Sequence, residues 1–267
     1  MNTIKHLYTN NKQIFAELKY TETISSKYKK HFHTHFGITL IDKGSLKISY
    51  DKYAPKELNN CAIAIFNPLQ VHFTESLTAQ GYYVLFLDKE WCKSLQDNIF
   101  ISDTIINDSI LYMQFKILFK KILTGHICNP SSVLEKIMKD FFQNHGSIQI
   151  KKETTIVRKI KALVEENSDT SFSLEDVSRS MGYNKSYIVR LFKKEVGLTP
   201  QQYILNVKVN KAKDFLTYAT NESLSNISVN TGFFDQSHFN RNFESTFGTS
   251  PKMYKKVNIV QDNHYDM

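Results

Sequence analysis

The spacing of apolar residues changes once along the chain, near residue 103. Before that point apolar and polar positions alternate, as at 46–50, or apolar residues form short blocks at 62–66 and 82–87, which is typical of β-strands. The segment D-K-G-S predicts a hairpin with Gly44 in its turn. Several short strands of this kind favour a small β-barrel or sandwich.

After residue 103 the period is helical. One amphipathic helix is predicted to end near Gly125, and a second to run from Pro130 to Gly146. Their apolar stripes fit packing on the barrel at least as well as a dimer seam. The apolar positions at helical spacing are Ile110, Leu111, Met113, Phe115, Leu118, Phe119, Ile122 and Leu123, then Val133, Leu134, Ile137, Met138, Phe141 and Phe142.

Residues 223–248 have the order of a helix-turn-helix motif, with Ser223 available as the first N-cap. Gly232 suits the positive φ of a tight turn between the two helices, and Phe233 follows to fill the seam. In the second helix Phe239 and Phe243 lie four residues apart and define a buried face. This face is continued by Asn242 and Phe247, and the apolar side of the first helix is expected from Leu224, Ile227 and Val229.

The motif occurs twice. Residues 186–203 align without gaps to residues 237–254, with identical Ser, Arg, Phe, Gly, Pro and Tyr at an offset of 51. Upstream of these blocks the offset is 50, so the second copy has one extra residue in its turn. Between the copies a helix is predicted from Pro200 to about residue 219, roughly 30 Å long at 1.5 Å per residue. Because one turn of DNA is about 34 Å, such a rod would hold two recognition helices in successive major-groove segments.

The polar face of each second helix carries residue types that read DNA. Arginine binds guanine, asparagine or glutamine binds adenine, and serine binds either base. Both copies place an arginine opposite the phenylalanine stripe. Lys185 and Lys193 are expected on phosphates, and Val189 against a thymine methyl group. The predicted DNA-binding residues are Lys185, Ser186, Val189, Arg190 and Lys193 in the first copy, and Gln236, Ser237, His238, Asn240 and Arg241 in the second.

Two motifs, G-F-x-D-Q-S-H-F-x-R-x-F at 232–243 and G-x-x-P-x-x-Y at 248–254, carry a resemblance to the DNA-binding domain of the AraC family of bacterial transcription regulators. The order H-x-H then G at 33–44, followed by N-P-x-x-x-H at 67–72, resembles the cupin-like effector domain of many such regulators. The resemblance implies an α+β protein of two domains: a cupin-like β-barrel with packed helices, and an all-α domain with two helix-turn-helix motifs joined by a long helix. The expected parts are an effector-sensing or dimerisation domain at 1–147, a linker at 148–155, a DNA-binding domain at 156–258 with motifs at 174–196 and 223–248 around the helix 200–219, and a tail at 259–267.

Three histidines of the first domain, His33, His35 and His72, are candidate effector-binding residues. His33 and His35 are two apart on a predicted strand, so both would point to one side of it. Cupin-type metal sites normally add a glutamate shortly after the second histidine, where this chain has Ile38 and Thr39. We therefore expect no metal and no other cofactor. The histidines are expected either to line a polar effector pocket or to be hydrogen-bonded near the barrel mouth.

Composition supports this interpretation. The chain has 267 residues, 41% of them hydrophobic, and a net charge of +8 that suits a polyanionic partner. Cys61, Cys92 and Cys128 form no C-x-x-C pair and are expected to be reduced packing residues. No secretion signal or membrane-spanning run is found, which predicts a cytoplasmic protein, associated with the bacterial nucleoid when it is bound to DNA.

The function that these features favour is a sequence-specific transcription regulator, not an enzyme, in which the first domain senses a small molecule. The resemblance implies activation more often than repression, and double-stranded promoter DNA and RNA polymerase as partners, with a homodimer as a further expectation. Two alternatives remain open at this stage: a metal-dependent cupin-like enzyme fused to a DNA-targeting module, and an effector-free regulator whose first domain only dimerises.

Overall fold

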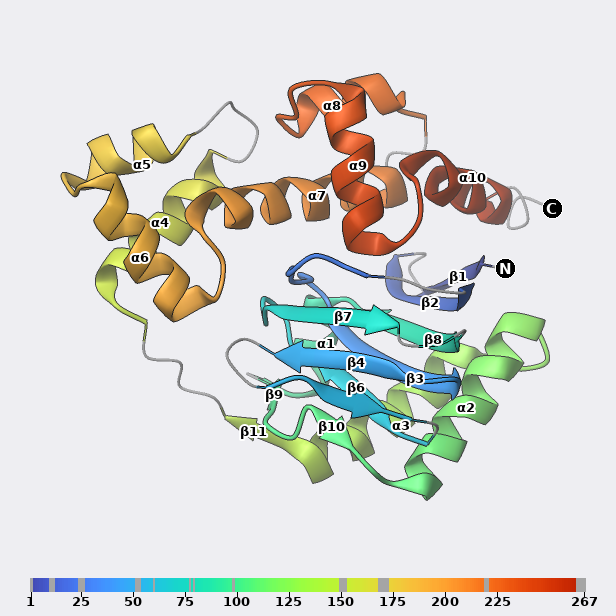
Figure 1. Ribbon diagram of the computed structural model, residues 1–267. Helices are drawn as coiled ribbons and strands as arrows, with labels where there is room; N and C mark the ends of the chain where they lie inside the picture. Colours follow the sequence, from blue (N-terminus) through green and yellow to red (C-terminus); the bar gives the residue numbers. More distant parts are fainter. Residues whose placement is uncertain are drawn as a thin grey trace. The chain divides into compact units, whose positions relative to one another are not determined.

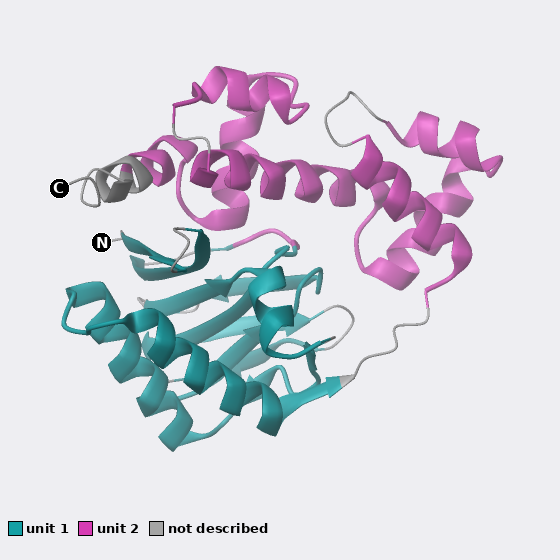
Figure 2. Ribbon diagram, turned by 180° about the vertical axis from the view of Figure 1, so that it is seen from behind, with its two compact units in different colours: residues 1–27, 32–50, 54–150 teal, residues 28–31, 51–53, 151–267 magenta. Residues whose placement is uncertain are grey.

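A computed structural model describes residues 2–9, 13–23, 27–50, 54–59, 61–76, 78, 80–97, 99–148, 153–167, 173–218 and 221–262. The chain divides into two compact units (Figure 2). Unit 1 contains residues 1–27, 32–50 and 54–150, and unit 2 contains residues 28–31, 51–53 and 151–267.

Unit 1 is built on a six-stranded antiparallel sheet. A three-stranded sheet and a two-stranded ladder accompany it, and within the described residues the three do not close into one barrel. The large sheet has the order β1 (Asn2–Tyr8), β2 (Ile14–Thr23), β8 (Gln80–Leu87), β3 (Phe36–Lys43), β6 (Ile63–Phe66), β10 (Ile105–Ile106); the small sheet is β5 (Lys56–Leu58), β4 (Leu46–Tyr50), β7 (His72–Ser76); the ladder is β11 (Gly146–Ile148) with β9 (Ile99–Ile101).

The predicted hairpin around Gly44 is only partly correct. Gly44 has the left-handed backbone of a tight turn, with φ of 76°. The two strands that it joins nevertheless lie in different sheets, because β3 pairs with β6 and β8 while β4 pairs with β5 and β7. The reason is burial: Leu46 and Ile48 of β4 pack with Ala64 and Tyr82 of the large sheet in one apolar cluster. The turn therefore carries the chain from one layer of a sandwich to the other.

The other face of the large sheet is covered by α2 (Ser109–Thr124) and α3 (Pro130–His145), as Figure 1 shows. Both helices end at the predicted glycines, Gly125 and Gly146. The buried stripe of α2 runs through Tyr112, Phe115 and Phe119, all at most 2% exposed. Packing on the sheet, one of the two predicted roles of these helices, is thus confirmed.

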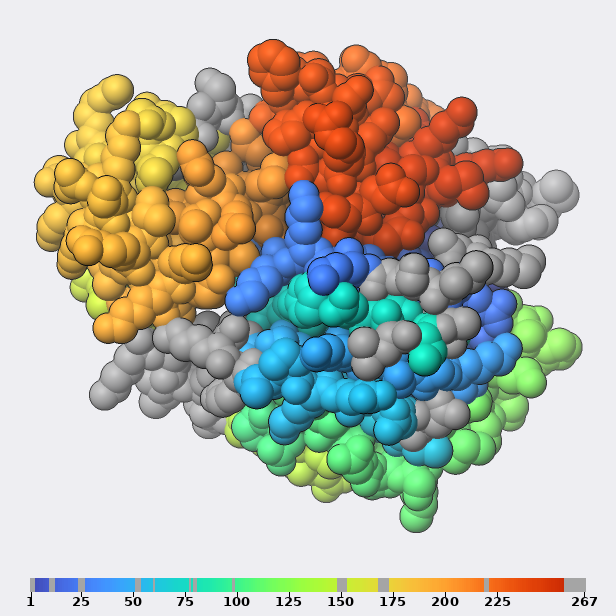
Figure 3. Space-filling model, in the orientation of Figure 1, coloured from blue at the N-terminus to red at the C-terminus, as the bar shows by residue number. Residues whose placement is uncertain are grey.

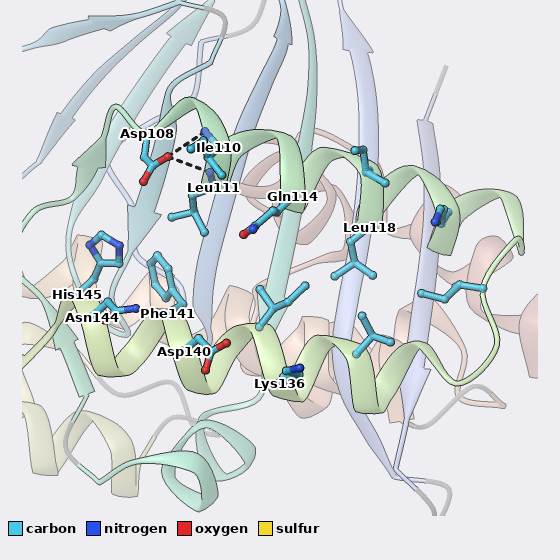
Figure 4. A pocket seen from close by; sticks show the side chains of 15 residues that line it. Asp108, Ile110, Leu111, Gln114, Leu118, Lys136, Asp140, Phe141, Asn144 and His145 are labelled. Atoms are coloured by element: carbon cyan, nitrogen blue, oxygen red, sulfur yellow. Dashed lines mark hydrogen bonds between the residues drawn. The ribbon is translucent and has the colours of Figure 1, made fainter.

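Not all apolar positions of these helices face the core. Ile110 is 73% exposed, Met113 47% and Ile117 50%, because the inward stripe of α2 leaves them on the opposite side. A groove of about 720 Å³ runs along the outer side of α2 and α3, with apolar residues such as Leu111 and Leu118 and polar residues such as Gln114 and Asp140 in its walls (Figure 4). The dimer seam remains a prediction.

Unit 2 is helical in its described residues, and its turns are set by cap residues. Ser173 and Asp176 form a capping box at the start of α5, and Ser223 caps α8 as the sequence predicts. α7 is the longest helix of the described residues, at 19 residues. The helices of unit 2 are α4 (Thr155–Glu166), α5 (Leu174–Met181), α6 (Lys185–Val196), α7 (Pro200–Tyr218), α8 (Leu224–Asn230), α9 (Gln236–Phe247) and α10 (Pro251–Asp262).

The ends of the predicted linker and tail differ from the structure. Residue 148, given to the linker, is the last residue of β11, which pairs with β9, and α4 begins at Thr155. Residues 149–152 of that linker lie outside the described residues, as do residue 219 of the predicted helix 200–219 and residues 263–267 of the tail. The first part of the tail is helical, because α10 continues to Asp262.

Only one of the three cysteines is a packing residue. Cys92, in α1 (Lys89–Leu95), is buried, and burial raises the pKa of its thiol. Cys61 and Cys128 are exposed, so the prediction that all three pack in the interior is wrong for these two. None of the described helices has both the length and the apolar character needed to cross a membrane.

The buried imidazole of His31 predicts an acid-sensitive fold. Burial lowers the pKa of His31 to about 4, although a hydrogen bond to the Lys29 carbonyl, 2.6 Å away, acts in the opposite direction. The pKa in the unfolded chain is about 6.5. The free energy of unfolding should therefore be undiminished above pH 6.5 and fall as the pH drops toward 4, by about 2–3 kcal/mol.

Urea denaturation between pH 7.5 and pH 4.5 measures this effect. His31→Gln should flatten the fall between pH 6.5 and pH 4.5, because the glutamine has no proton to gain in the unfolded chain. An identical pH dependence in the variant and the natural chain would contradict the assignment to His31.

Candidate nucleic-acid interface

Both helix pairs of unit 2 have a left-handed glycine in the turn between their helices. Gly182 ends α5 with φ of 67°, and Gly232 takes φ of 72° between α8 and α9, as its position predicts. In the first pair the Gly182 amide donates to the Ser178 carbonyl at 3.0 Å. In the second, the Phe233 amide donates to the Ser228 carbonyl at the same distance. In each motif a left-handed glycine thus lies between the first helix and the second, which is α6 or α9.

The inner face of α9 is an aromatic row. Phe239 and Phe243 are fully buried, with ring centroids 5.7 Å apart, and Phe247 follows at 4.8 Å from Phe243. Asn242 is also buried and donates from Nδ2 to the His238 carbonyl at 2.7 Å. On α8, by contrast, Val229 is 67% exposed, so its predicted place on the apolar side is wrong; the small side chain of Ser228 is buried there instead.

The outer face of α9 presents three of its five predicted DNA-binding residues openly. Gln236, Ser237 and Arg241 are exposed, whereas His238 and Asn240 are half-buried. The His238 ring lies edge-on to Phe233, with centroids 5.5 Å apart. In the space-filling view of Figure 3, side chains of residues 224–247, orange to red, form part of the visible surface of unit 2.

On α6, Ser186, Arg190 and Lys193 are exposed and Val189 is half-buried. Lys185 is exposed as well, but its ammonium forms an ion pair with the Glu175 carboxylate of α5. A phosphate would have to compete with that carboxylate for Lys185.

Sequence reasoning missed three exposed aromatic residues beside these helices. Tyr183 and Tyr187 are 43% and 41% exposed, and their rings lie against each other at the start of α6, with centroids 5.5 Å apart and planes tilted by 36°. Phe234, just before α9, is 93% exposed. An apolar residue next to a turn glycine is usually assigned to the core by pattern alone, and for Phe233 that assignment is right.

One helix, α7, contacts both helix-turn-helix motifs. Near its start, Tyr203 packs edge-on against Phe192 of α6, with ring centroids 5.3 Å apart. Further along, the Lys208 ammonium donates to the Gly232 carbonyl at 2.7 Å, and the Lys213 ammonium lies 5.5 Å from the Phe247 ring. α7 therefore forms a hydrogen bond to the turn of the second motif and packs against the core of the first.

We expect Lys208→Met to loosen the second motif. The methionine keeps the apolar stem but removes the buried ammonium that donates to the Gly232 carbonyl, and losing such a hydrogen bond costs about 1–3 kcal/mol. Burial lowers the pKa of Lys208, because the ammonium has lost part of its hydration. The hydrogen bond to the Gly232 carbonyl offsets part of the free-energy cost of that desolvation.

Urea denaturation and amide exchange at the α8–α9 turn measure this loss. Lys252→Met, at an exposed position of α10, is the matched control and should leave both unchanged. Equal stability of the Lys208 variant and the control would contradict a structural role for the Lys208 bond.

Two of the three predicted effector histidines of unit 1 are in ring contact with each other. His33 and His72 are buried together, with ring centroids 5.1 Å apart. His35 has its Nε2 3.8 Å from the Asp88 carboxylate. The prediction that His33 and His35 share one strand is wrong, because β3 begins only at Phe36.

The chain resembles known regulators in sequence. A family model described as a helix-turn-helix domain matches residues 177–256. The transposon Tn10 TetD protein of Escherichia coli is 34% identical over 103 residues, which are 39% of this chain and 74% of TetD. The multiple antibiotic resistance protein MarA of E. coli K12 is 31% identical over 102 residues, 38% of this chain and 80% of MarA. The HTH-type transcriptional regulator YbfI of Bacillus subtilis is 24% identical over 237 residues, 80% of this chain and 82% of YbfI.

The fold is similar to that of ToxT from Vibrio cholerae. A crystal structure of an apo ToxT variant from strain SCE256 superposes with a TM-score of 0.63 at 15% identity, covering 92% of this chain and 98% of ToxT. This match spans both units and confirms the two-domain α+β fold class. The family is shown by TetD and MarA, each more than 30% identical over most of its own length: the chain belongs to the AraC family of DNA-binding transcription regulators.

Proposed function

We propose that the chain recognises one promoter site through two readers, α6 and α9, each placed in its own segment of the major groove. The observation that carries this proposal is the pair Arg190 and Arg241. They lie 51 residues apart at the same position of the repeat, both are exposed, and both stand opposite a buried phenylalanine, Phe192 or Phe243. Arginine at such a position is the side chain that most often reads guanine.

The length of α7 supports simultaneous reading. Its 19 residues span about 28 Å at 1.5 Å per residue, which is close to the 34 Å of one DNA turn. Since α7 contacts both motifs, their separation is fixed by the rod and not by a flexible linker. One protomer then covers two half-sites about one helical turn apart.

Base reading within α9 is assigned to Arg241 and Gln236, with Ser237 beside them. In α6 it is assigned to Arg190 and Ser186. The half-buried His238, Asn240 and Val189 contribute fewer contacts, and Lys185 and Lys193 bind phosphates. The smaller share of His238, Asn240 and Val189 follows from their half-buried side chains. The lysines are assigned to phosphates because of their charge.

Unit 1 is proposed to sense a small molecule that alters transcription. Structures of ToxT carry bound unsaturated fatty acid and bound (E)-4-(8-methylnaphthalen-1-yl)but-3-enoic acid, which supports a ligand-binding role for this fold. His33 and His72, buried side by side, are the polar groups that we assign to it. A relative from Rhodococcus is named transcriptional activator NphR, which favours activation. Contact with RNA polymerase is part of the proposal. A homodimer through α2 and α3 completes the proposal.

Sequencing of genomic fragments captured by the purified protein tests the DNA-binding part. The salt concentration must be stated, because phosphate contacts make the affinity salt-dependent. We expect a shared motif of two blocks whose centres lie about 10 base pairs apart. Uniform recovery of unrelated fragments would refute sequence-specific reading.

Ligand screening by thermal denaturation tests the sensing part. A ligand that binds only the folded chain raises the melting temperature, by an amount that grows with its concentration. His33→Ala and His72→Ala should abolish that shift, whereas His126→Ala, distant in sequence, should keep it. A ligand response unchanged in both histidine variants would remove His33 and His72 from the sensor.

A further inference from the structure

Phe234 is the most exposed of the large apolar side chains that the structure describes. It is 93% exposed, against 73% for Ile110 and 67% for Val229. Its neighbour Phe233 is 6% exposed and packs against Phe239, with ring centroids 5.3 Å apart. The two consecutive phenylalanines therefore have different roles, and the fold itself makes use only of the first.

Phe234 is also the extra residue of the second motif. In the first motif Tyr183 is followed directly by Asn184, which caps α6 by accepting from the Ser186 amide at 2.8 Å. In the second motif Phe233 is followed by Phe234 and only then by Asp235, which caps α9. The change of offset from 50 to 51 between the copies falls at this residue.

Phe234 directly precedes the N-cap of α9, a position with a common structural role that another residue fills in this chain. An apolar residue just before an N-cap often packs on the fourth residue of the helix, here Phe239. Phe233 makes that contact instead. An inserted phenylalanine that supports neither the turn nor the helix is free to serve a ligand.

On the proposed function, the DNA surface nearest to Phe234 is the edge of the block that α9 reads. The N-terminal residues of a recognition helix contact base edges, and Gln236 and Ser237 follow Phe234 by two and three residues on the exposed side of α9. In the major groove the apolar group that a base offers is the C5-methyl of thymine, and phenylalanine is one of the side chains that contact it.

We propose that Phe234 is a specificity-determining residue that packs on a thymine methyl group at the edge of the block read by α9. This assignment rests on the proposed function, because it requires α9 to lie in the major groove. It adds a preference for thymine that the polar side chains of α9 do not supply.

A double-mutant cycle between protein and DNA tests the assignment. The probes are the captured DNA site and a set of copies in which each thymine of the second block is replaced, one at a time, by deoxyuridine, which lacks only the methyl group. For the natural chain we expect one such replacement to weaken binding about fourfold, the effect of burying one methyl group. Phe234→Ala should bind the unmodified site about tenfold more weakly and should be indifferent to that replacement.

Two variants keep the result interpretable. Phe234→Leu retains an apolar side chain and should recover part of the affinity and of the response to the methyl group. Met253→Ala, at a 56% exposed apolar position of α10, is the matched control and should bind like the natural chain. Because Phe234 is exposed, its variants should keep the melting temperature of the natural chain.

Three outcomes would overturn the assignment. Binding by Phe234→Ala that equals that of the natural chain, while Arg241→Ala loses specificity, would refute it and leave the proposed function standing. An equal response of the natural chain and Phe234→Ala to every deoxyuridine would exclude the methyl contact. Unchanged DNA binding combined with lost transcription would show that Phe234 contacts a protein. If the natural chain itself selects no site, the proposed function fails first.

Discussion

Phe243→Ala is expected to abolish reading by α9 while α6 still binds its block. The ring is fully buried between Phe239, Phe247 and Tyr254, with centroids 4.8 to 5.7 Å away. Truncating a buried phenylalanine of this kind costs about 3–5 kcal/mol, because the cavity cannot close completely. That is a large part of the stability of a small helical domain, so α8 and α9 should lose their fixed arrangement.

The repeat supplies a matched partner for this experiment. Phe192 occupies the same position in α6, is fully buried, and packs against Tyr203. Phe192→Ala should remove protection of the other DNA block in footprinting, with circular dichroism measuring the helix content of both variants. Loss of the same block in both variants would contradict the assignment of one block to each motif.

The Arg190→Ala/Arg241→Ala double variant should lose about 2–6 kcal/mol of binding free energy on the specific site. Each arginine is exposed and is assigned to one guanine, and a good bidentate contact discriminates by about 1–3 kcal/mol. The two lie on separate helices, so their effects should add. Binding to random DNA should change little beyond the loss of two positive charges.

Fluorescence anisotropy at several salt concentrations separates the two effects. Lys194→Ala/Lys252→Ala removes the same charge from two exposed positions and controls for electrostatics. Equal losses on specific and random DNA would show that the arginines contact phosphates and not bases.

The second half of the chain was predictable because its signals are local and occur twice. A glycine at each turn, a proline at the start of α7 and phenylalanines at helical spacing define the elements independently of long-range contacts. The structure places them as that pattern requires, with Gly182, Gly232 and Gly248 all left-handed. Exposure within α9 was less predictable, since the half-buried state of His238 depends on its contact with Phe233.

The first half was harder to predict because its sheet buries polar residues. His6 of β1 and Glu17 of β2 face each other, 3.3 Å apart, and both are buried, so the two strands show no clear alternation of apolar and polar positions. Those strands were missed. The hairpin at Gly44 failed for a different reason: local turn chemistry determines that the chain reverses, but only packing determines which sheet the next strand joins.

Phe234 illustrates the same limit at the level of a single residue. In the sequence it stands beside Phe233 and has the same side chain, yet one is buried and the other open. Comparing the two copies locates the extra residue in the turn, and only the structure shows that this residue has no place in the core.

The most direct test of two readers on one rod is to change the spacing of the two DNA blocks. Inserting five base pairs between them turns one block by half a helical turn to the opposite face of the duplex. Because α7 contacts both motifs, we predict a loss of affinity of at least about 100-fold, since one whole block of base contacts at 1–3 kcal/mol each is forfeited. An affinity that survives the insertion would contradict the account, because it would require the two motifs to move independently.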